Sequence, residues 1–365
     1  MKQKVFVGVS GGVDSSVSAA LLKDAGYNVT GVFIKTWSPD FLPCTWKEER
    51  RDAMRVCAAL NIPFLTLDCE KEYKEGVADY MIAEYKVGRT PNPDVMCNKE
   101  VKFGVFLRKA LEMGADFVAT GHYVQVAAQR EKGNSTNTYS LSEAVDKNKD
   151  QSYFLWTLTQ SQLAHILFPV GHLTKPEVRK LAKKYNLPTA LKKDSQGICF
   201  VGKVDMADFL KHFIDIKPGV VLNTEGDHIG THDGAVFYTI GQRHGFTVDA
   251  QKNDAQSYYC IAKDIEKNTL TVSHSPHTEN PNTKTVRLGN VNIIRGDIKE
   301  LLLSKTLSCR VRYRQPLLPC TLSEVSGTLQ VTFSEPSLVA AGQSVVIYGD
   351  ETKGCKEMLL GGVVM

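Results

Sequence analysis

The chain has 365 residues, 42% of them hydrophobic and 23% charged, which is typical of a soluble protein with two or three domains. It contains no run of about 18 apolar residues, and its N-terminus lacks the layout of a signal peptide, so we expect a cytoplasmic protein without a membrane partner. The net charge of +4 permits a nucleic-acid partner without requiring one.

Residues 1–205 alternate strand and helix patterns. Apolar, β-branched runs predict strands at 4–10, 28–35, 63–69 and 115–123. Helical spacing of apolar residues predicts helices at 14–27, 50–61 and 98–114. This α/β alternation indicates a Rossmann-like parallel sheet with helices on both faces, which binds ligands at the carboxyl ends of its strands.

The pattern changes further along the chain. Residues 130–149 are polar and rich in Gly, Asn and Ser, which predicts a mobile loop. Helices are expected at 153–171 and at 174–186, the second with Thr174 and Glu177 as a capping box.

Beyond residue 205 helix patterns fade, and short strands with intervening turns predict a β-rich central domain followed by a small β-barrel or sandwich. We therefore expect three domains: an α/β domain at 1–205, a β-rich central domain at 206–278 and a C-terminal β-barrel at 279–365.

The nine cysteines include no C-x-x-C pair. An odd count without a signal peptide argues against a secreted disulfide framework. The missing pair also argues against zinc and iron–sulfur sites, so we expect neither cofactor and no metal-ligand set.

A glycine-rich junction joins the first strand to the first helix. In "GVSGGVDSS" the glycines let backbone N–H groups face an anion, and the helix N-terminus adds a partial positive charge. No Gly-Lys-Ser/Thr follows, so this is not a Walker A loop. S-G-G-x-D-S is typical of the pyrophosphate-binding (PP) loop of ATP pyrophosphatases; the alternative is a tight turn that merely needs glycine.

Two cysteines are candidate nucleophiles. Cys97 follows the rigid "RTPNPDVM" segment at the predicted start of a helix, near Lys99 and Lys102, where a thiolate is favoured. Asp94 lies three residues earlier and could exchange a proton. Cys199 follows Gly197 in "KKDSQGICFVG". Each could equally be a small buried residue of the core.

Seven motifs in order along the whole chain resemble those of the tRNA-specific 2-thiouridylases (the MnmA, or TrmU, family). They are "GVSGGVDSS", "PNPDVMCNKEVKF", "TGHY", "KDQSYFL", "DSQGICFVG", "RYRQPLLPC" and "GQSVVIY". The departures are Ile34, where relatives often have Met, and a partial match before Gln343.

The resemblance implies roles for individual residues. ATP would contact Ile34, Gly121 and the PP loop, which comprises Gly8, Val9, Ser10, Gly11, Gly12, Val13, Asp14 and Ser15. The target base would contact Asn92, Pro93 and Asp94. Cys97 would be the nucleophile and Cys199 the persulfide carrier. Contacts with tRNA are implied for His122, Asp150, Gln151, Ser152, Arg312, Tyr313 and Gln343.

The implied reaction replaces O2 of a wobble uridine by sulfur. ATP, with Mg²⁺ neutralising its phosphates, would adenylate O2, and a sulfur-donor protein (a cysteine desulfurase or sulfur-relay protein) would load the persulfide. Sulfur transfer could pass through a Cys97–Cys199 disulfide or through direct persulfide attack.

Separately, a strand over "CRVRYR" would place Arg310, Arg312 and Arg314 on one face, which suits phosphates or a merely solvated surface.

Other functions fit parts of the sequence. An ammonia-using ligase or amidotransferase, or a tRNA lysidine-type ligase, would need neither cysteine. A cluster-dependent sulfurtransferase would need C-x-x-C. A non-catalytic RNA-binding protein with structural ATP would need none of Asp94, Cys97 and Cys199.

Overall fold

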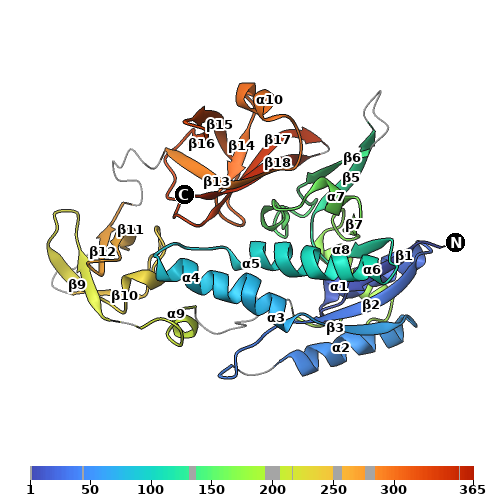
Figure 1. Ribbon diagram of the computed structural model, residues 1–365. Helices are drawn as coiled ribbons and strands as arrows, with labels where there is room; N and C mark the ends of the chain where they lie inside the picture. The colour runs from blue at the N-terminus through green and yellow to red at the C-terminus, as the bar shows by residue number, and fades with distance from the viewer. Residues whose placement is uncertain are drawn as a thin grey trace.

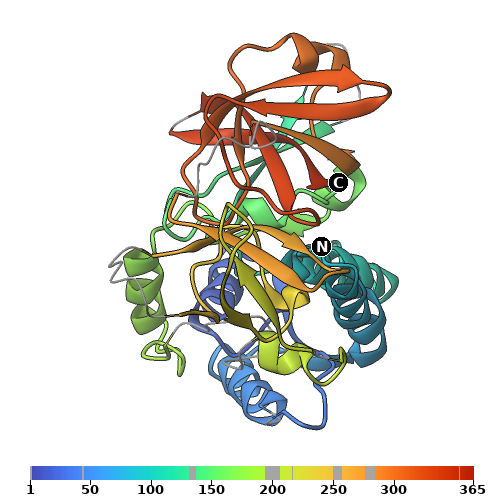
Figure 2. The same ribbon diagram turned by 90° about the vertical axis from the view of Figure 1, so that its left-hand side faces the viewer.

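The computed structural model describes residues 2–42, 45–130, 137–193, 206–215, 217–249, 257–275, 284–352 and 354–365. These ranges form an N-terminal α/β domain, a central β domain and a C-terminal barrel (Figure 1). The barrel lies over both other domains in two perpendicular views (Figure 2).

The described part of the N-terminal domain contains a five-stranded parallel sheet in the order β3-β2-β1-β4-β7. Its strands are β1 (Lys4–Gly8), β2 (Asn28–Lys35), β3 (Phe64–Asp68), β4 (Phe117–Ala119) and β7 (Ile166–Leu167). The four strands expected from the sequence are confirmed, whereas β7 was expected to be helical.

Helices cover both faces of this sheet, as expected. Successive side chains of a strand point to opposite faces, so Val5 and Val7 enter one apolar cluster and Phe6 enters the other. The first cluster is closed by α1 (Val13–Asp24), α2 (Trp46–Ala59) and α8 (Lys175–Lys184), and the second by α6 (Phe106–Glu112).

The helix predicted at 98–114 begins earlier. Its segments follow one another directly as α5 (Pro93–Met96), a π-helical stretch (Cys97–Val105) and α6; we call residues 93–112 the Cys97 helix. Proline suits a first helical turn, and the side chain of Asn92 accepts a hydrogen bond from the Val95 N–H, 3.3 Å away. Three further helical segments precede it and were not predicted: α3 (Glu70–Tyr73), a π-helical stretch (Lys74–Asp79) and α4 (Tyr80–Lys86).

The loop predicted at 130–149 is wrong for residues 137–142, which form a strand, whereas residues 143–149 contain neither helix nor strand. Strands β5 (Gln125–Arg130) and β6 (Asn137–Ser142) pair as antiparallel neighbours, and β6 also pairs with the last strand of the barrel. This long-range pairing supplies hydrogen-bond partners that a polar sequence does not reveal. The β5–β6 pair thereby joins the N-terminal half of the chain to the C-terminal domain.

The helix predicted at 153–171 is also wrong. That segment contains a 3₁₀ turn (Ser152–Phe154), the short helix α7 (Gln160–Leu163) and β7. Its apolar side chains, including Tyr153 and Trp156, are buried all round, and a short, wholly buried apolar run lacks the one-sided period that identifies a helix. The next helix, α8, has the predicted capping box of Thr174 and Glu177.

The described central domain consists of α9 (Met206–Leu210), a 3₁₀ turn (Ala235–Phe237) and a sheet in the order β10-β9-β8-β12-β11. Its strands are β8 (Gly219–Leu222), β9 (His228–His232), β10 (Phe246–Val248), β11 (Tyr259–Asp264) and β12 (Thr269–Ser273).

In the described C-terminal residues, the strand order β13-β16-β15-β14-β17-β18 closes through a β13–β18 pairing, so the domain is a barrel and not a sandwich. A short helix, α10 (Ile298–Leu303), packs against its apolar interior. The strands are β13 (Thr285–Ile293), β14 (Ser308–Arg310), β15 (Leu318–Val325), β16 (Thr328–Phe333), β17 (Ser344–Thr352) and β18 (Cys355–Val364).

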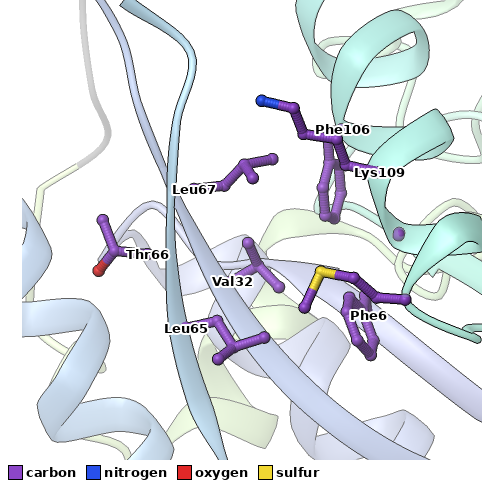
Figure 3. A pocket seen from close by; sticks show the side chains of 9 residues that line it. Phe6, Val32, Leu65, Thr66, Leu67, Phe106 and Lys109 are labelled. Atoms are coloured by element: carbon purple, nitrogen blue, oxygen red, sulfur yellow. The ribbon is translucent and has the colours of Figure 1, made fainter.

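An apolar pocket lies between the edge strand β3 and α6, lined by side chains that include Leu65, Leu67 and Phe106 (Figure 3). None of its lining residues belongs to the PP loop or to the first turns of the Cys97 helix. Across the residues described, no helix is both long enough and apolar enough to cross a membrane.

Candidate active site

The PP loop (residues 8–15) connects β1 to α1. Gly11 has a φ of 73°, and a Cβ there would lie 2.7 Å from the carbonyl oxygen of Glu49, so glycine is required on both grounds. The Ser10 hydroxyl lies 3.4 Å from the Ser15 hydroxyl, and the Ser10 N–H donates to that same oxygen over 3.3 Å. The loop thus presents hydroxyls and backbone N–H groups at the start of α1, which is suited to an anion.

The loop lies at the switch point of the sheet. The chain runs from β1 outward to β2 and β3, then returns to β4 on the other side of β1. Ligands of open parallel sheets bind in the crevice that forms at such a reversal. Gly121, just after β4, lies against the loop, because a Cβ there would be 2.6 Å from the Ser15 nitrogen. Ile34 lies near the carboxyl end of β2, paired with Leu67.

Asp14 has partners that sequence reasoning missed. Its carboxylate accepts a hydrogen bond from the Tyr123 hydroxyl over 2.7 Å. It also forms an ion pair with Lys175, whose Nζ lies 2.7 and 2.8 Å from the two carboxylate oxygens. Lys175 is the first residue of α8, and its ammonium also lies 5.7 Å from the centre of the Tyr123 ring. The only sequence signal was a lysine at a predicted helix N-terminus, where a positive charge is disfavoured.

The residues predicted to contact the target base begin the Cys97 helix. Burial raises the pKa of Asp94, and the positive charge of Lys102 opposes that rise only in part. Cys97 is buried and lies in the second helical turn. The prediction that it lies at the helix start is therefore wrong, because the helix begins four residues earlier, at Pro93. Lys99, predicted to favour a thiolate, pairs instead with Glu100 over 3.1 Å.

His122, predicted to face tRNA, is buried. Its Nδ1 lies 2.7 Å from the Thr120 hydroxyl, and its ring packs with those of Phe103 and Phe168 in a cluster of three mutually contacting rings. Burial, with a smaller effect of the Lys102 charge, lowers its pKa well below 6.5, so the ring is neutral at pH 7. A tRNA contact by this side chain stays a prediction.

Asp150, Gln151 and Ser152 form a polar cluster with the barrel. Arg310 donates to Asp150 over 2.6 Å and to Glu143 over 2.9 Å, and the Ser152 hydroxyl donates to Asp150 over 2.9 Å. The Gln151 side chain accepts from the Tyr123 N–H. Asp150 and Ser152 are buried, so their predicted contacts with tRNA also stay predictions.

The prediction of three arginines on one strand face is wrong. Strand β14 ends at Arg310, which is buried in its ion pairs, and Arg314 adopts a φ of 62° beyond the strand. Arg312 is exposed and donates to the carbonyl oxygens of Ile240 and Leu338, which joins the central domain to the barrel. Two buried carboxylates that follow β6, those of Glu143 and Asp150, therefore determine where Arg310 points.

Two other predicted tRNA contacts lie close to the start of the Cys97 helix. A Cβ on Gly342, next to Gln343, would lie 3.1 Å from the backbone of Thr90, two residues before Asn92. The Tyr313 ring lies 4.6 Å from that of Phe154. The three domains meet at Thr90, which donates its N–H to Ala341 and lies 3.2 Å from the Thr239 hydroxyl.

Cys199 lies outside the described residues, as does Gly197. The chain leading to it is anchored beside the PP loop, where Lys192 pairs with Asp52 over 2.7 Å. The chain after it resumes at α9, whose Phe209 packs in the same apolar cluster as Cys97.

A hydroxyl-rich glycine loop without a Walker lysine, at the switch point of a parallel sheet, defines an ATP pyrophosphatase-type domain. Comparison with known families agrees. Residues 3–203 match the family described as tRNA methyl transferase HUP domain, residues 207–274 its PRC-barrel domain, and residues 283–364 the aminomethyltransferase beta-barrel domain.

Curated relatives cover almost the whole chain. It is 42% identical to tRNA-specific 2-thiouridylase MnmA 2 of Geobacillus kaustophilus (99% of this chain, 94% of the relative) and 43% identical to MnmA of Colwellia psychrerythraea (99% and 95%). Among solved structures, NMN synthetase from Francisella tularensis is 18% identical, with a TM-score of 0.33 over 53% of this chain and 66% of that one. The chain belongs to the tRNA-specific 2-thiouridylase family.

Proposed function

We propose that this protein is a tRNA-uridine 2-sulfurtransferase. It would use ATP to adenylate O2 of the wobble uridine and replace that oxygen by sulfur, giving 2-thiouridine, AMP and pyrophosphate. The observation that carries the proposal is the similarity to 2-thiouridylases over all three domains. We place the reaction in the cytoplasm, where its tRNA substrate would be found.

Adenylation would take place at the PP loop. Gly8 to Ser15 would hold the phosphates through N–H groups and hydroxyls, and the backbone of Ile34 and Gly121 would line the nucleotide. The carboxylate of Asp14 is suited to Mg²⁺, which proteins commonly hold through one or two carboxylates and substrate phosphates. When bound, Mg²⁺ would neutralise phosphate charge.

Sulfur transfer would need both proposed cysteines. A sulfur-donor protein would load Cys199 as a persulfide. Attack of the Cys97 thiolate on the inner sulfur would form a Cys97–Cys199 disulfide and release hydrosulfide, which displaces AMP at C2; a reductant would then restore both thiols. Alternatively, the terminal persulfide sulfur would attack C2 directly and displace AMP, and the Cys97 thiolate would then cleave the resulting C2–S–S–Cys199 link at the Cys199 sulfur, giving the same disulfide. The neighbouring Asp94, whose pKa burial raises, would accept or return a proton.

The tRNA would be held where the domains meet. Asn92, Pro93 and Asp94 would contact the target base, flipped out of its stack to reach the adenylate. Arg312 and Tyr313 would contact the RNA from the barrel. Gln343 would join them, because its side-chain oxygen is buried and has no hydrogen-bond partner in the part of the chain that is described.

The test combines the purified protein with ATP, Mg²⁺, unmodified tRNA and a persulfide donor. We expect AMP and pyrophosphate in equal amounts and 2-thiouridine by mass spectrometry of the tRNA. Ser10→Ala should suppress AMP formation, whereas Ser334→Ala, on an exposed part of the barrel, should not. Steady AMP release without tRNA, or sulfur at another position, would contradict the proposal.

A further inference from the structure

The ion pair between Lys175 and Asp14 breaks a local rule. Lys175 is the first residue of α8, with Thr174 and Glu177 as its capping box, so a cation sits at the positive end of a helix dipole. Its side chain is only 14% exposed. Positions that violate a local preference without an evident structural gain are often functional.

The helix fixes the position of this ammonium. The Lys175 N–H donates to the Asp146 carboxylate over 2.9 Å, and the Thr174 N–H donates to Glu177 over 2.7 Å. On the opposite side, Asp14 belongs to the first turn of α1. Lys175 is therefore held at the PP loop by an element 161 residues away along the chain.

The charge at the loop needs a cation. Apart from backbone N–H groups, the loop offers the neutral hydroxyls of Ser10 and Ser15 and one carboxylate, that of Asp14. A carboxylate beside a polyphosphate is repulsive unless a positive charge accompanies it. Lys175 carries such a charge within hydrogen-bond distance of that carboxylate.

We propose that Lys175 is a catalytic residue of the adenylation step and binds the pyrophosphate part of ATP. This inference rests on the proposed function. As uridine O2 forms its bond to the α-phosphorus, the bond from that phosphorus to the bridging oxygen breaks, and the electron pair goes to the departing pyrophosphate. The ammonium of Lys175 stabilises this developing charge while keeping its proton.

The experiment uses the full-length protein and two probes, inorganic pyrophosphate and AMP, in binding calorimetry. Lys175→Met keeps the length of the side chain and removes the charge. We expect the Kd for pyrophosphate to rise about 10- to 100-fold, as for loss of a charge-assisted hydrogen bond, and the Kd for AMP to stay within about twofold. Formation of AMP with tRNA should fall about 10²- to 10³-fold.

Two further variants separate binding from charge neutralisation. Lys183→Met removes an exposed charge from the same helix and should bind pyrophosphate like the wild type. In a titration without Mg²⁺, so that no metal bridges Asp14 and the ligand, Asp14→Asn should bind pyrophosphate at least as well as the wild type, since Lys175 remains and a like charge is gone. Asp14→Asn combined with Lys175→Met should stay weak. Circular dichroism and melting curves check that each variant is folded.

The outcomes are distinct. If Lys175→Met binds pyrophosphate like Lys183→Met, or if the double variant regains wild-type affinity, Lys175 serves only Asp14 and the inference is wrong. If the wild type forms AMP with tRNA while either of these two results is found, the proposed function stands and only the role of Lys175 is wrong. If the wild type forms no AMP with tRNA, the proposed function itself fails.

Discussion

Replacing Arg310 by methionine should destabilise the protein strongly. The guanidinium side chain is 8% exposed and pairs with Glu143 and Asp150, which are 4% and 1% exposed. Methionine fills the space of the aliphatic stem but leaves two carboxylates in the interior of the junction between the β5–β6 hairpin and the barrel. Breaking a buried ion pair from one side costs about 3–5 kcal/mol.

The remaining contacts set the magnitude within that range. Asp150 still accepts hydrogen bonds from Ala144 and Ser152, and Glu143 keeps its ion pair with Lys147. Because both carboxylates retain donors, we expect the lower end, ~3 kcal/mol. In a domain of about 150–250 residues, such as the N-terminal one that holds both carboxylates, this corresponds to a fall in melting temperature of roughly 6–12 °C.

The assay compares melting temperatures of wild type, Arg310→Met and a matched control. Arg89→Met removes an equally short pair, with Glu84, in which the arginine side chain is 47% exposed, so it should cost no more than ~1 kcal/mol. An Arg310→Met variant that melts within the error of Arg89→Met would refute the reasoning.

The dependence on pH provides a second check. Burial raises the pKa of Glu143, but Lys147, the Lys356 N–H and Arg310 together lower it below its usual value. A carboxylate with a lowered folded-state pKa stabilises the protein above the unfolded pKa of about 4.3 and loses that contribution as pH falls through the folded value. The penalty of Arg310→Met should therefore be largest at pH 7 and shrink below about pH 4.

Four further predictions concern the reaction. Gly121→Ala would place a Cβ 2.6 Å from the backbone of the PP loop, so ATP affinity and AMP formation should both fall at least tenfold. Equilibrium binding and product analysis measure the two effects. Wild-type ATP affinity would contradict the close contact between Gly121 and the loop. Asp94→Asn should remove the acidic limb of the pH–rate profile, which lies above the usual aspartate range because burial raises the Asp94 pKa; a retained limb would assign it to another group. Cys199→Ser should accept no persulfide, whereas Cys97→Ser should become persulfidated yet fail at transfer. Mass spectrometry after one turnover without reductant should find a Cys97–Cys199 disulfide beside thiolated tRNA. An RNA–S–S–Cys199 adduct with Cys97 still a free thiol would instead indicate direct persulfide attack. Arg312→Ala should weaken tRNA binding and reduce the slope of log affinity against log salt concentration by about one. An unchanged slope would show that Arg312 contacts no phosphate and serves only to join the central domain to the barrel.

The sequence by itself determined the features that depend on neighbouring residues. The glycine loop between β1 and α1, the capping box of α8 and the bounds of β2 follow from backbone geometry and side-chain period, which act within a few residues. The expected C-terminal barrel is confirmed, although the strand patterns alone also allowed a sandwich, because they do not encode whether the last strand pairs with the first.

Only the tertiary structure decided which distant groups meet. It buried Arg310 against two carboxylates that its own strand pattern cannot reveal, and it made residues 137–142 a strand by pairing them with β5 and β18. It also brought Lys175 to Asp14. Each of these contacts is stabilised by burial, hydrogen bonding or charge pairing only once segments far apart in the sequence have been brought together. No local sequence pattern therefore predicts them.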